Sequence, residues 1–174
     1  MKNSIIKILS CSRLMPLLMA GISAASLGMA FMAQYVFGLA PCILCLIQRW
    51  PFAIIIVLGL IGTLLSYKYQ KTVAGIMGLI GLTFITNSVI AFYHTGVELH
   101  WWPSHLEGCA VPDLGTDPNN ILAALESTQA VRCDEIPWAD PVLNLSMANY
   151  NVIFCLGFGV IALISAHLIW KKEK

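Results

Sequence analysis

Charged residues are scarce in this chain. They make up 11% of its 174 residues, whereas 58% are hydrophobic. A soluble domain of this length carries about 25% charged residues, because polar side chains must cover its surface. The chain also lacks a basic patch with interleaved aromatic residues, which is the pattern of a nucleic-acid-binding surface. The composition therefore gives no support for a nucleic-acid partner and indicates an integral membrane protein in contact with the lipid bilayer.

The few charges divide the chain into four long uncharged runs. These runs hold 35, 18, 26 and 30 residues and span 14–48, 50–67, 72–97 and 141–170. A helix needs about 20 apolar residues to cross a bilayer, and Gly38 and Pro41 favour a turn within the first run. We therefore expect a single all-α membrane domain over 1–174, a four-helix bundle with helices near 15–36, 42–66, 73–95 and 147–170 and outer loops at 37–41 and 96–146.

The start of the chain could be mistaken for a cleavable signal peptide, because Lys2 and Lys7 precede an apolar stretch with small residues. A signal peptide turns polar after about 7–15 apolar residues. Here the apolar character continues through MAFMAQYVFGLA. We expect the first helix to be retained.

The basic residues predict the orientation of the bundle. Eight of the ten lie before the first helix, between the second and third, or after the fourth. Lys and Arg concentrate on the cytoplasmic side of membrane proteins, so both termini are expected in the cytoplasm. Eight of the nine acidic residues lie between Glu98 and Asp140, in the second outer loop.

This topology sorts the six cysteines into three groups. Cys42 and Cys45 lie at the outer end of the second helix, and Cys109 and Cys133 lie in the long outer loop. Cys11 and Cys155 are interpreted as small apolar residues that fill space. Four cysteines in an oxidising compartment allow three disulfide connectivities, and spacing alone does not choose among them.

The surroundings of Cys42 and Cys45 favour a reactive thiol. Pro41 suits the first turn of a helix, which would place both cysteines where free backbone N–H groups stabilise a thiolate. Arg49 follows Cys45 by four residues and Cys42 by seven, so all three are expected on one helix face. A helix start, a cation and a Cys-x-x-Cys spacing together lower a thiol pKa. Taken alone, Arg49 would be interpreted as an interfacial anchor.

These motifs resemble those of a known family. PCxLCxxQR after a first transmembrane helix, followed by a second cysteine pair in a long outer loop flanked by GVELHWWPSHLEGC and RCDEIPW, is similar to the disulfide bond formation protein B (DsbB) family. The resemblance implies a bacterial inner-membrane protein-dithiol:quinone oxidoreductase with periplasmic cysteine loops. Its partner would be a periplasmic thioredoxin-fold oxidase (DsbA-like), and its electron acceptor ubiquinone or menaquinone.

The resemblance also implies roles for individual residues. Cys109 and Cys133 would form the disulfide that accepts electrons from the partner, with Cys109 in the mixed disulfide. Cys133 would then exchange with Cys42 of the redox-active Cys42–Cys45 pair, leaving Cys45 as the thiolate that faces the quinone. Arg49 and His94 match family residues that lie beside the quinone ring. Thiol exchange requires an accessible sulfur, so the loop pair is expected to be exposed to water.

The remaining loop features have simpler interpretations. Asp117 and Pro118 before NNILAALESTQ predict a short amphipathic helix on the membrane surface. Trp101 and Trp102 are interpreted as interface anchors. His94, His100, His105 and Cys109 are residue types that could ligate a metal. No metal is expected, because the chain has no second Cys-x-x-Cys.

Two other functions are compatible with outer cysteines and four helices. One is a thiol-quinone enzyme like vitamin K epoxide reductase, in which the pair near the quinone follows the loop pair in sequence; here it precedes. The other is a non-enzymatic, disulfide-stapled or metal-binding tetraspan protein, which would have no use for Arg49.

Overall fold

The computed structural model describes residues 2–104, 106, 109 and 132–172, and its secondary structure there is helical apart from one isolated β-bridge between Ala139 and Ser146. Four helices are long and apolar enough to cross a membrane, which confirms the all-α four-helix membrane bundle. They comprise α2 (Leu14–Tyr35), the consecutive α3 (Ile43–Ile47) and α4 (Arg49–Leu65), α5 (Gln70–Glu98) and α7 (Met147–Lys172). At 22 residues, α2 is about 33 Å long, which matches a hydrocarbon core of about 30 Å.

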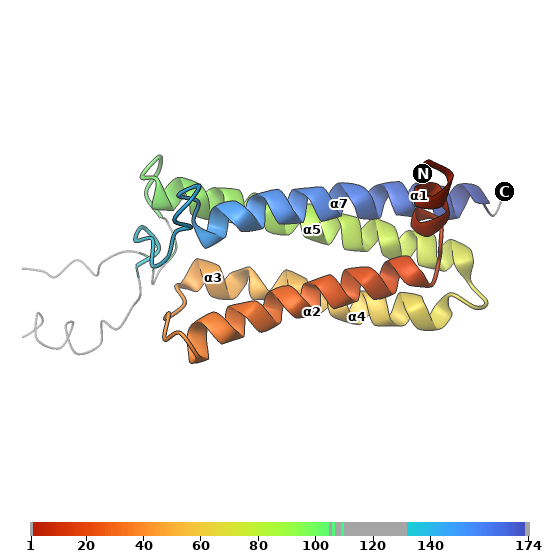
Figure 1. The fold of residues 1–174 in the computed structure, drawn as a ribbon, viewed down its shortest axis with the longest axis horizontal. Helices are drawn as coiled ribbons and strands as arrows, with labels where there is room; N and C mark the ends of the chain where they lie inside the picture. Colours follow the sequence, from red (N-terminus) through yellow and green to blue (C-terminus); the bar gives the residue numbers. More distant parts are fainter. Residues whose placement is uncertain (1, 105, 107–108, 110–131, 173–174) are drawn as a thin grey trace, which may run out of the picture.

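The helices run side by side as two closely packed pairs, α2 with α4 and α5 with α7, and α4 joins the pairs by packing on α5 (Figure 1). Both chain termini lie at one end of the bundle, here called the terminal end. The opposite end, here called the cysteine end, carries α3, the C-terminal end of α5 and the start of α7. The core between the pairs is formed by methionine, isoleucine and phenylalanine side chains that include Met19, Ile55, Met77, Ile80 and Phe84.

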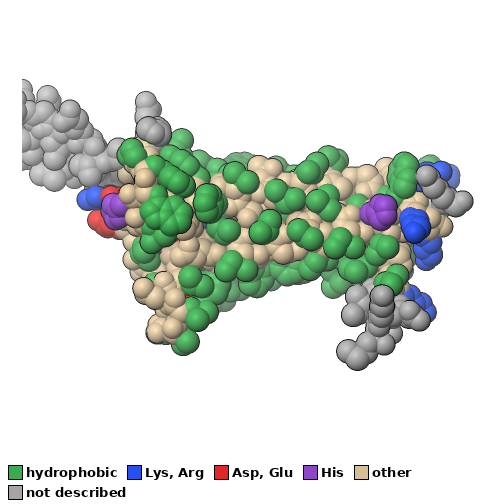
Figure 2. Space-filling model, turned by 90° about the horizontal axis from the view of Figure 1, so that it is seen from above, with side chains coloured by type: hydrophobic (Ala, Val, Ile, Leu, Met, Phe, Trp, Pro, Cys, Tyr) green, Lys and Arg blue, Asp and Glu red, His purple; other side chains and the backbone are tan. Residues whose placement is uncertain are grey.

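The outward-facing side chains of the bundle are apolar. Leu64, Val89 and Ile153 are 76%, 63% and 60% exposed, and hydrophobic side chains are spread along the body of the molecule in Figure 2. Large apolar side chains on the surface of a long helix are stable in lipid and costly in water. The surface therefore agrees with a bundle embedded in a bilayer.

Basic side chains gather at the terminal end (Figure 2). There Arg13 lies 4.9 Å from the ring centroid of Tyr67, and Lys171 and Lys172 occupy the last turn of α7. A short helix that the sequence patterns did not predict, α1 (Lys2–Leu9), lies across this end. The Ser165 hydroxyl donates a hydrogen bond of 2.7 Å to the carbonyl of Leu9, which fixes α1 to α7.

The second membrane-crossing segment is interrupted, whereas one continuous helix near 42–66 was expected. A turn at Gln48 separates α3 from α4. Pro51 explains the break, because proline has no N–H to bond the carbonyl of Ile47 and its ring collides with that carbonyl in a regular helix. The break places Gln48 among the buried side chains of the bundle, where it is 7% exposed.

The short helix expected from Asp117 onward lies outside the described residues. The first loop is seen in full, and Gly38 adopts a left-handed conformation (φ 68°) just after α2. Glycine is the residue that reaches this conformation without steric cost. The turn expected at Gly38 is therefore present.

Candidate active site

Four cysteines meet at the cysteine end of the bundle. Cys42, Cys109 and Cys133 belong to one buried cluster with Leu44 and Val97, and Cys45 packs against it. Cys42 precedes α3, whereas Cys109 and Cys133 lie in the long connection between α5 and α7. The structure thus brings together two pairs that are more than 60 residues apart in sequence.

Cys42 is the N-cap residue of α3. Its Sγ accepts a hydrogen bond of 3.3 Å from the backbone N–H of Cys45, and the two sulfur atoms lie 3.0 Å apart. Both thiols of this pair are free. Pro41 therefore lies before the cap rather than in the first turn, and the cap position directs the sulfur of Cys42 at the free N–H groups of the helix.

His94, on α5, is the second group that contacts Cys42. Its Nε2 lies 3.5 Å from Cys42 Sγ, and its Nδ1 lies 3.0 Å from Nε2 of Gln48. The Gln48 amide is in turn oriented by Asn151 of α7, whose Nδ2 donates to Gln48 Oε1. An amide nitrogen only donates hydrogen bonds, so Nδ1 of His94 is the acceptor and Nε2 carries the proton toward Cys42.

These contacts set the acidity of Cys42. The hydrogen bond with Cys45, followed by the contact with His94, lowers the pKa of the Cys42 thiol to about 4, although burial opposes the shift. The sequence assigned the thiolate to Cys45 by resemblance and the stabilising cation to Arg49. In the reduced pair seen here the lowered pKa is that of Cys42, and the side chain beside it is His94 rather than Arg49.

Glu98 lies one turn beyond His94 on α5, and its carboxyl group is buried. Its Oε1 lies 3.7 Å from Nε2 of His94, and its Oε2 accepts a hydrogen bond of 2.5 Å from the hydroxyl of Ser146. Glu98 and Ser146 are only 6% and 1% exposed. A buried carboxyl group needs a hydrogen-bond donor, and the hydroxyl of Ser146 supplies one.

Arg49 contacts α2 rather than the cysteine pair. Its Nη1 donates to Oε1 of Gln34 at 2.7 Å, and its guanidinium lies 5.0 Å from the ring centroid of Phe31. Among the described residues no carboxylate lies within ion-pair distance of Arg49. Its positive charge is therefore available to an anionic or partly negative group between α2 and α4.

Cys109 and Cys133 form a disulfide. Cys133 is fully buried and Cys109 is 4% exposed, so the expected exposure of this pair to water is wrong for this state of the protein. The cause is the apolar cluster: both sulfurs pack with Val97 and Leu44 against the end of the bundle.

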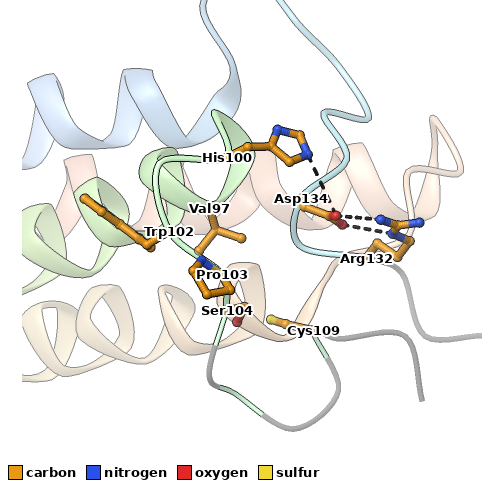
Figure 3. A pocket seen from close by; sticks show the side chains of 8 residues that line it. All are labelled: Val97, His100, Trp102, Pro103, Ser104, Cys109, Arg132 and Asp134. Atoms are coloured by element: carbon orange, nitrogen blue, oxygen red, sulfur yellow. Dashed lines mark hydrogen bonds and ion pairs between the residues drawn. The ribbon is translucent and has the colours of Figure 1, made fainter. Parts of the chain in front are cut away.

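A cavity of about 370 Å³ opens beside Cys109. Figure 3 shows that it is surrounded by Val97 at the end of α5, by residues of the segment that follows α5, and by Arg132 and Asp134. Arg132 donates two hydrogen bonds to Asp134, of 2.9 and 2.6 Å, and this pairing lowers the pKa of the Asp134 carboxyl. The cavity is lined by Val97, His100, Trp102, Pro103, Ser104, Cys109, Arg132 and Asp134.

Trp102 forms one wall of this cavity and is half-buried. Its indole N–H donates to the carbonyl of Tyr93, and its ring stacks on the Tyr93 ring at a centroid distance of 6.0 Å. The ring packs so closely against Gly96 that a side chain at that position would collide with it. Trp102 thus packs on α5 beside the disulfide, whereas Trp101 is 57% exposed and suits the expected anchor.

The donor atoms of Cys42, Cys45 and His94 lie within 4.8 Å of one another, so a metal site must be considered. In a tetrahedral zinc site with Zn–S bonds of about 2.3 Å, two sulfurs are separated by about 3.8 Å. The sulfurs of Cys42 and Cys45 are closer, at 3.0 Å. Their spacing suits thiol–disulfide chemistry better. His100 faces Asp134 instead, and His105 lies outside the described residues.

The sequence patterns identified the cysteines, Arg49 and His94, but missed the polar side chains that position them. Gln48, Asn151, Glu98 and Ser146 come from three separated parts of the chain, and no spacing rule joins them. A weak signal existed for Glu98 alone, because a carboxylate inside an apolar helix is rare unless it is functional. Cys155 also proves to be hydrogen-bonded, to Oδ1 of Asn151 at 3.0 Å, rather than simple apolar filler.

Comparison with known proteins agrees with this geometry. The family model "Disulfide bond formation protein DsbB" matches residues 12–165. Disulfide bond formation protein B of Cupriavidus necator is 30% identical over 165 residues, which cover 94% of this chain and 96% of that protein. The protein of the same name from Albidiferax ferrireducens is 28% identical over 165 residues, which cover 88% and 86%. No solved structure matches the chain.

The family match covers both cysteine pairs, Arg49 and His94, and the four helices make the protein a multi-pass inner-membrane protein. The family match favours a DsbB-like oxidoreductase over a relative of vitamin K epoxide reductase and over a non-enzymatic, disulfide-stapled protein. The chain belongs to the DsbB family and is a membrane oxidoreductase that forms disulfide bonds.

Proposed function

We propose that the protein oxidises the dithiol of a periplasmic thioredoxin-fold oxidase and passes the two electrons to a membrane quinone. The observation that carries this proposal is the single buried cluster that contains Cys42, Cys109 and Cys133. Thiol–disulfide exchange requires a thiolate and a disulfide in contact. Packing both pairs in one cluster supports such exchange, which a purely structural disulfide would not require.

The first step takes place at Cys109 and Cys133. A thiolate of the partner attacks Cys109, which releases Cys133 as the leaving thiolate. The cavity beside Cys109 is where a segment of the partner would approach, and its rim carries the paired charges of Arg132 and Asp134. Since the disulfide is buried, we expect binding of the partner to displace part of the cluster.

The second step joins the two pairs. Cys133 attacks Sγ of Cys42 when Cys42 and Cys45 are joined as a disulfide, which releases Cys45 as the leaving thiolate. The second thiol of the partner then releases Cys109 from the mixed disulfide, and Cys109 attacks Cys133, which restores the Cys109–Cys133 bond and releases Cys42. The hydrogen bonds from Cys45 and His94 stabilise Cys42 as a thiolate, so Cys42 is a good leaving group in this last exchange.

Ubiquinone or menaquinone would supply a two-electron acceptor when bound. A partner similar to DsbA has a reduction potential of about −120 mV, so only a strong oxidant can oxidise its dithiol. Arg49 has no acidic partner among the described residues and lies with Gln34 and Phe31 between two helices. These side chains would hold an oxygen that gains negative charge and an aromatic ring, while His94 would contact the same site from α5.

The proposed orientation follows the basic residues at the terminal end. The terminal end faces the cytoplasm and the cysteine end faces the periplasm. The cysteine pairs then lie where disulfides form and persist.

The test uses the purified protein in detergent with a reduced thioredoxin-fold oxidase and a soluble ubiquinone or menaquinone analogue. We expect loss of quinone absorbance that stops in Cys45→Ser and Cys109→Ser. Arg49→Ala should raise the KM for the quinone more than it lowers kcat, because its charge acts on the bound quinone.

Matched controls exist at the terminal end. Cys11→Ser and Arg13→Ala make the same chemical changes far from the cluster and should retain wild-type turnover. Absence of turnover with both quinone analogues, or wild-type turnover in Cys45→Ser, would contradict the proposal.

A further inference from the structure

One imidazole N–H lies between two acidic groups at the buried end of α5. Nε2 of His94 is 3.5 Å from Sγ of Cys42 and 3.7 Å from Oε1 of Glu98. Because Gln48 occupies Nδ1, the proton of His94 is on Nε2 and faces both groups. A single N–H stabilises one of the two anions well, but not both together.

The surroundings of Glu98 contain no other cation among the described residues. The titratable groups that act on it are His94 on its own helix and Cys42 and Cys45 from the α3 side. The segment that leads into α7 contributes Ser146, whose neutral hydroxyl donates to Oε2. Like charges close together in a buried site do not ionise together easily. Cys42 and Glu98 therefore compete for one negative charge.

The competition depends on the redox state of the cysteine pair. When Cys42 and Cys45 are joined as a disulfide, no thiolate is present, and the N–H of His94 is free to stabilise the Glu98 carboxylate. When the pair is reduced, Cys42 becomes the thiolate and takes the N–H. Glu98 then loses the N–H of His94 as a partner, keeps only the hydroxyl of Ser146 and gains a negative neighbour, which favours its protonated form.

We propose that Glu98 binds a proton when the Cys42–Cys45 pair is reduced and releases it when the pair is oxidised. Glu98 is coupled to Cys42 through the N–H of His94, which can stabilise only one of the two groups as an anion. The proposal rests on the function proposed above, in which this pair cycles between the two states. It makes Glu98 a positioning residue for the reaction, since its carboxylate acts on Cys42 through the imidazole.

Atoms and electrons balance in each direction. Reduction breaks the Cys42–Cys45 bond and takes up two electrons and two protons; one proton goes to the Cys45 thiol and one to Glu98, while Cys42 remains a thiolate. Oxidation returns two electrons to the acceptor and releases the same two protons. The carboxyl group thus holds the proton that Cys42 itself does not retain.

The test measures how the reduction potential of the pair changes with pH. Full-length protein with Cys109→Ser and Cys133→Ser is equilibrated with dithiothreitol buffers near neutral pH, and oxidised and reduced forms are separated after alkylation. Two protons per two electrons change the equilibrium constant about 100-fold per pH unit, and one proton changes it about tenfold, which is about 30 mV. We expect the two-proton slope with Glu98 present and the one-proton slope in Glu98→Gln.

Glu135→Gln is the matched control, because it makes the same change at an exposed carboxylate of the same end. It should retain the two-proton slope. An unchanged slope in Glu98→Gln, or a one-proton slope already present with Glu98, would overturn the proposal.

A second measurement does not depend on the folding of the Glu98→Gln variant. Infrared difference spectra of the same background should show a protonated carboxyl band that appears on reduction and disappears on oxidation. Lack of that band would overturn the proposal too. Neither readout uses a quinone or a protein partner, so failure here with normal wild-type turnover would reject the role of Glu98 and leave the proposed function intact.

Discussion

At the scale of single residues, the chemistry of the site depends on how Cys42 is held. Its sulfur receives the backbone N–H of Cys45 and lies beside Cys45 Sγ and Nε2 of His94. Each of these groups stabilises a thiolate more than a thiol. His94 is the contact that a substitution can remove without altering the cysteine pair itself.

We expect His94→Ala to raise the pKa of Cys42. In the wild type the thiolate is present above about pH 4 and is lost as the pH falls through that value. Loss of one hydrogen bond to a charged group costs about 1.5–3 kcal/mol, so the midpoint should rise by about 1 to 2 pH units. The rate of Cys42 alkylation in the reduced protein, followed against pH by mass spectrometry, measures this midpoint.

The neighbouring His100 provides the control, since its side chain is 72% exposed and faces Asp134. His100→Ala should leave the alkylation profile of Cys42 unchanged. Identical midpoints in wild type and His94→Ala would show that His94 does not stabilise the thiolate.

The residues of the site differ in how far the sequence could predict them. Cys42, Cys45 and Arg49 lie within one local motif, so spacing alone identified them. His94 was found through the resemblance, and Glu98 was missed. Contacts that join α3, α5 and the start of α7 depend on tertiary packing, which no local pattern encodes.

At the scale of the elements, close helix contacts determine how the two pairs of helices pack. Gly59 of α4 faces α2 so closely that an added Cβ would lie 2.6 Å from the carbonyl oxygen of Pro16. A backbone carbonyl of a helix cannot move away from the added Cβ as the end of a flexible side chain can. The α2–α4 contact therefore requires glycine at this position.

We expect Gly59→Ala to destabilise the bundle by about 1–3 kcal/mol, because the added methyl group forces α2 and α4 apart. Thermal unfolding in detergent measures the change. Gly21→Ala, on α2 with open space around its Cβ, should be neutral or stabilising by about 0.5–1 kcal/mol. Equal stability of the Gly59 variant and wild type would contradict the close contact.

The elements themselves were largely predictable because uncharged runs of sufficient length have few alternatives to a membrane helix. The four spans were found in this way. The break at Gln48 was missed, although Pro51 signalled it, because a proline near the start of a membrane helix is often tolerated. The short α1 was missed because eight residues carry too little periodicity to be distinguished from a tail.

At the scale of the whole molecule, the two ends of the bundle differ in chemistry. The terminal end is basic, and the cysteine end carries the redox pairs together with Glu98 and Asp134. This asymmetry is the basis of the proposed orientation in the membrane.

Reporter fusions test that orientation. Alkaline phosphatase, which is active only after export, should be active when fused after Leu39 in the first loop and inactive when fused after Lys172. A fusion after Lys68, between α4 and α5, serves as an internal comparison and should also be inactive. The reverse pattern would place the cysteines in the cytoplasm and contradict the proposed partner.

The burial of the Cys109–Cys133 disulfide has a consequence for selectivity among reductants. A small thiol that enters the cavity finds Cys109 only 4% exposed, and Cys133 is buried in the cluster with Val97 and Leu44. A folded protein that binds the adjacent cavity can offset the cost of opening the cluster with its own contacts, whereas a free metabolite cannot. Burial of the disulfide therefore slows its reduction by low-molecular-weight thiols. Such a reaction would consume the electron acceptor in the membrane without forming a disulfide in a protein.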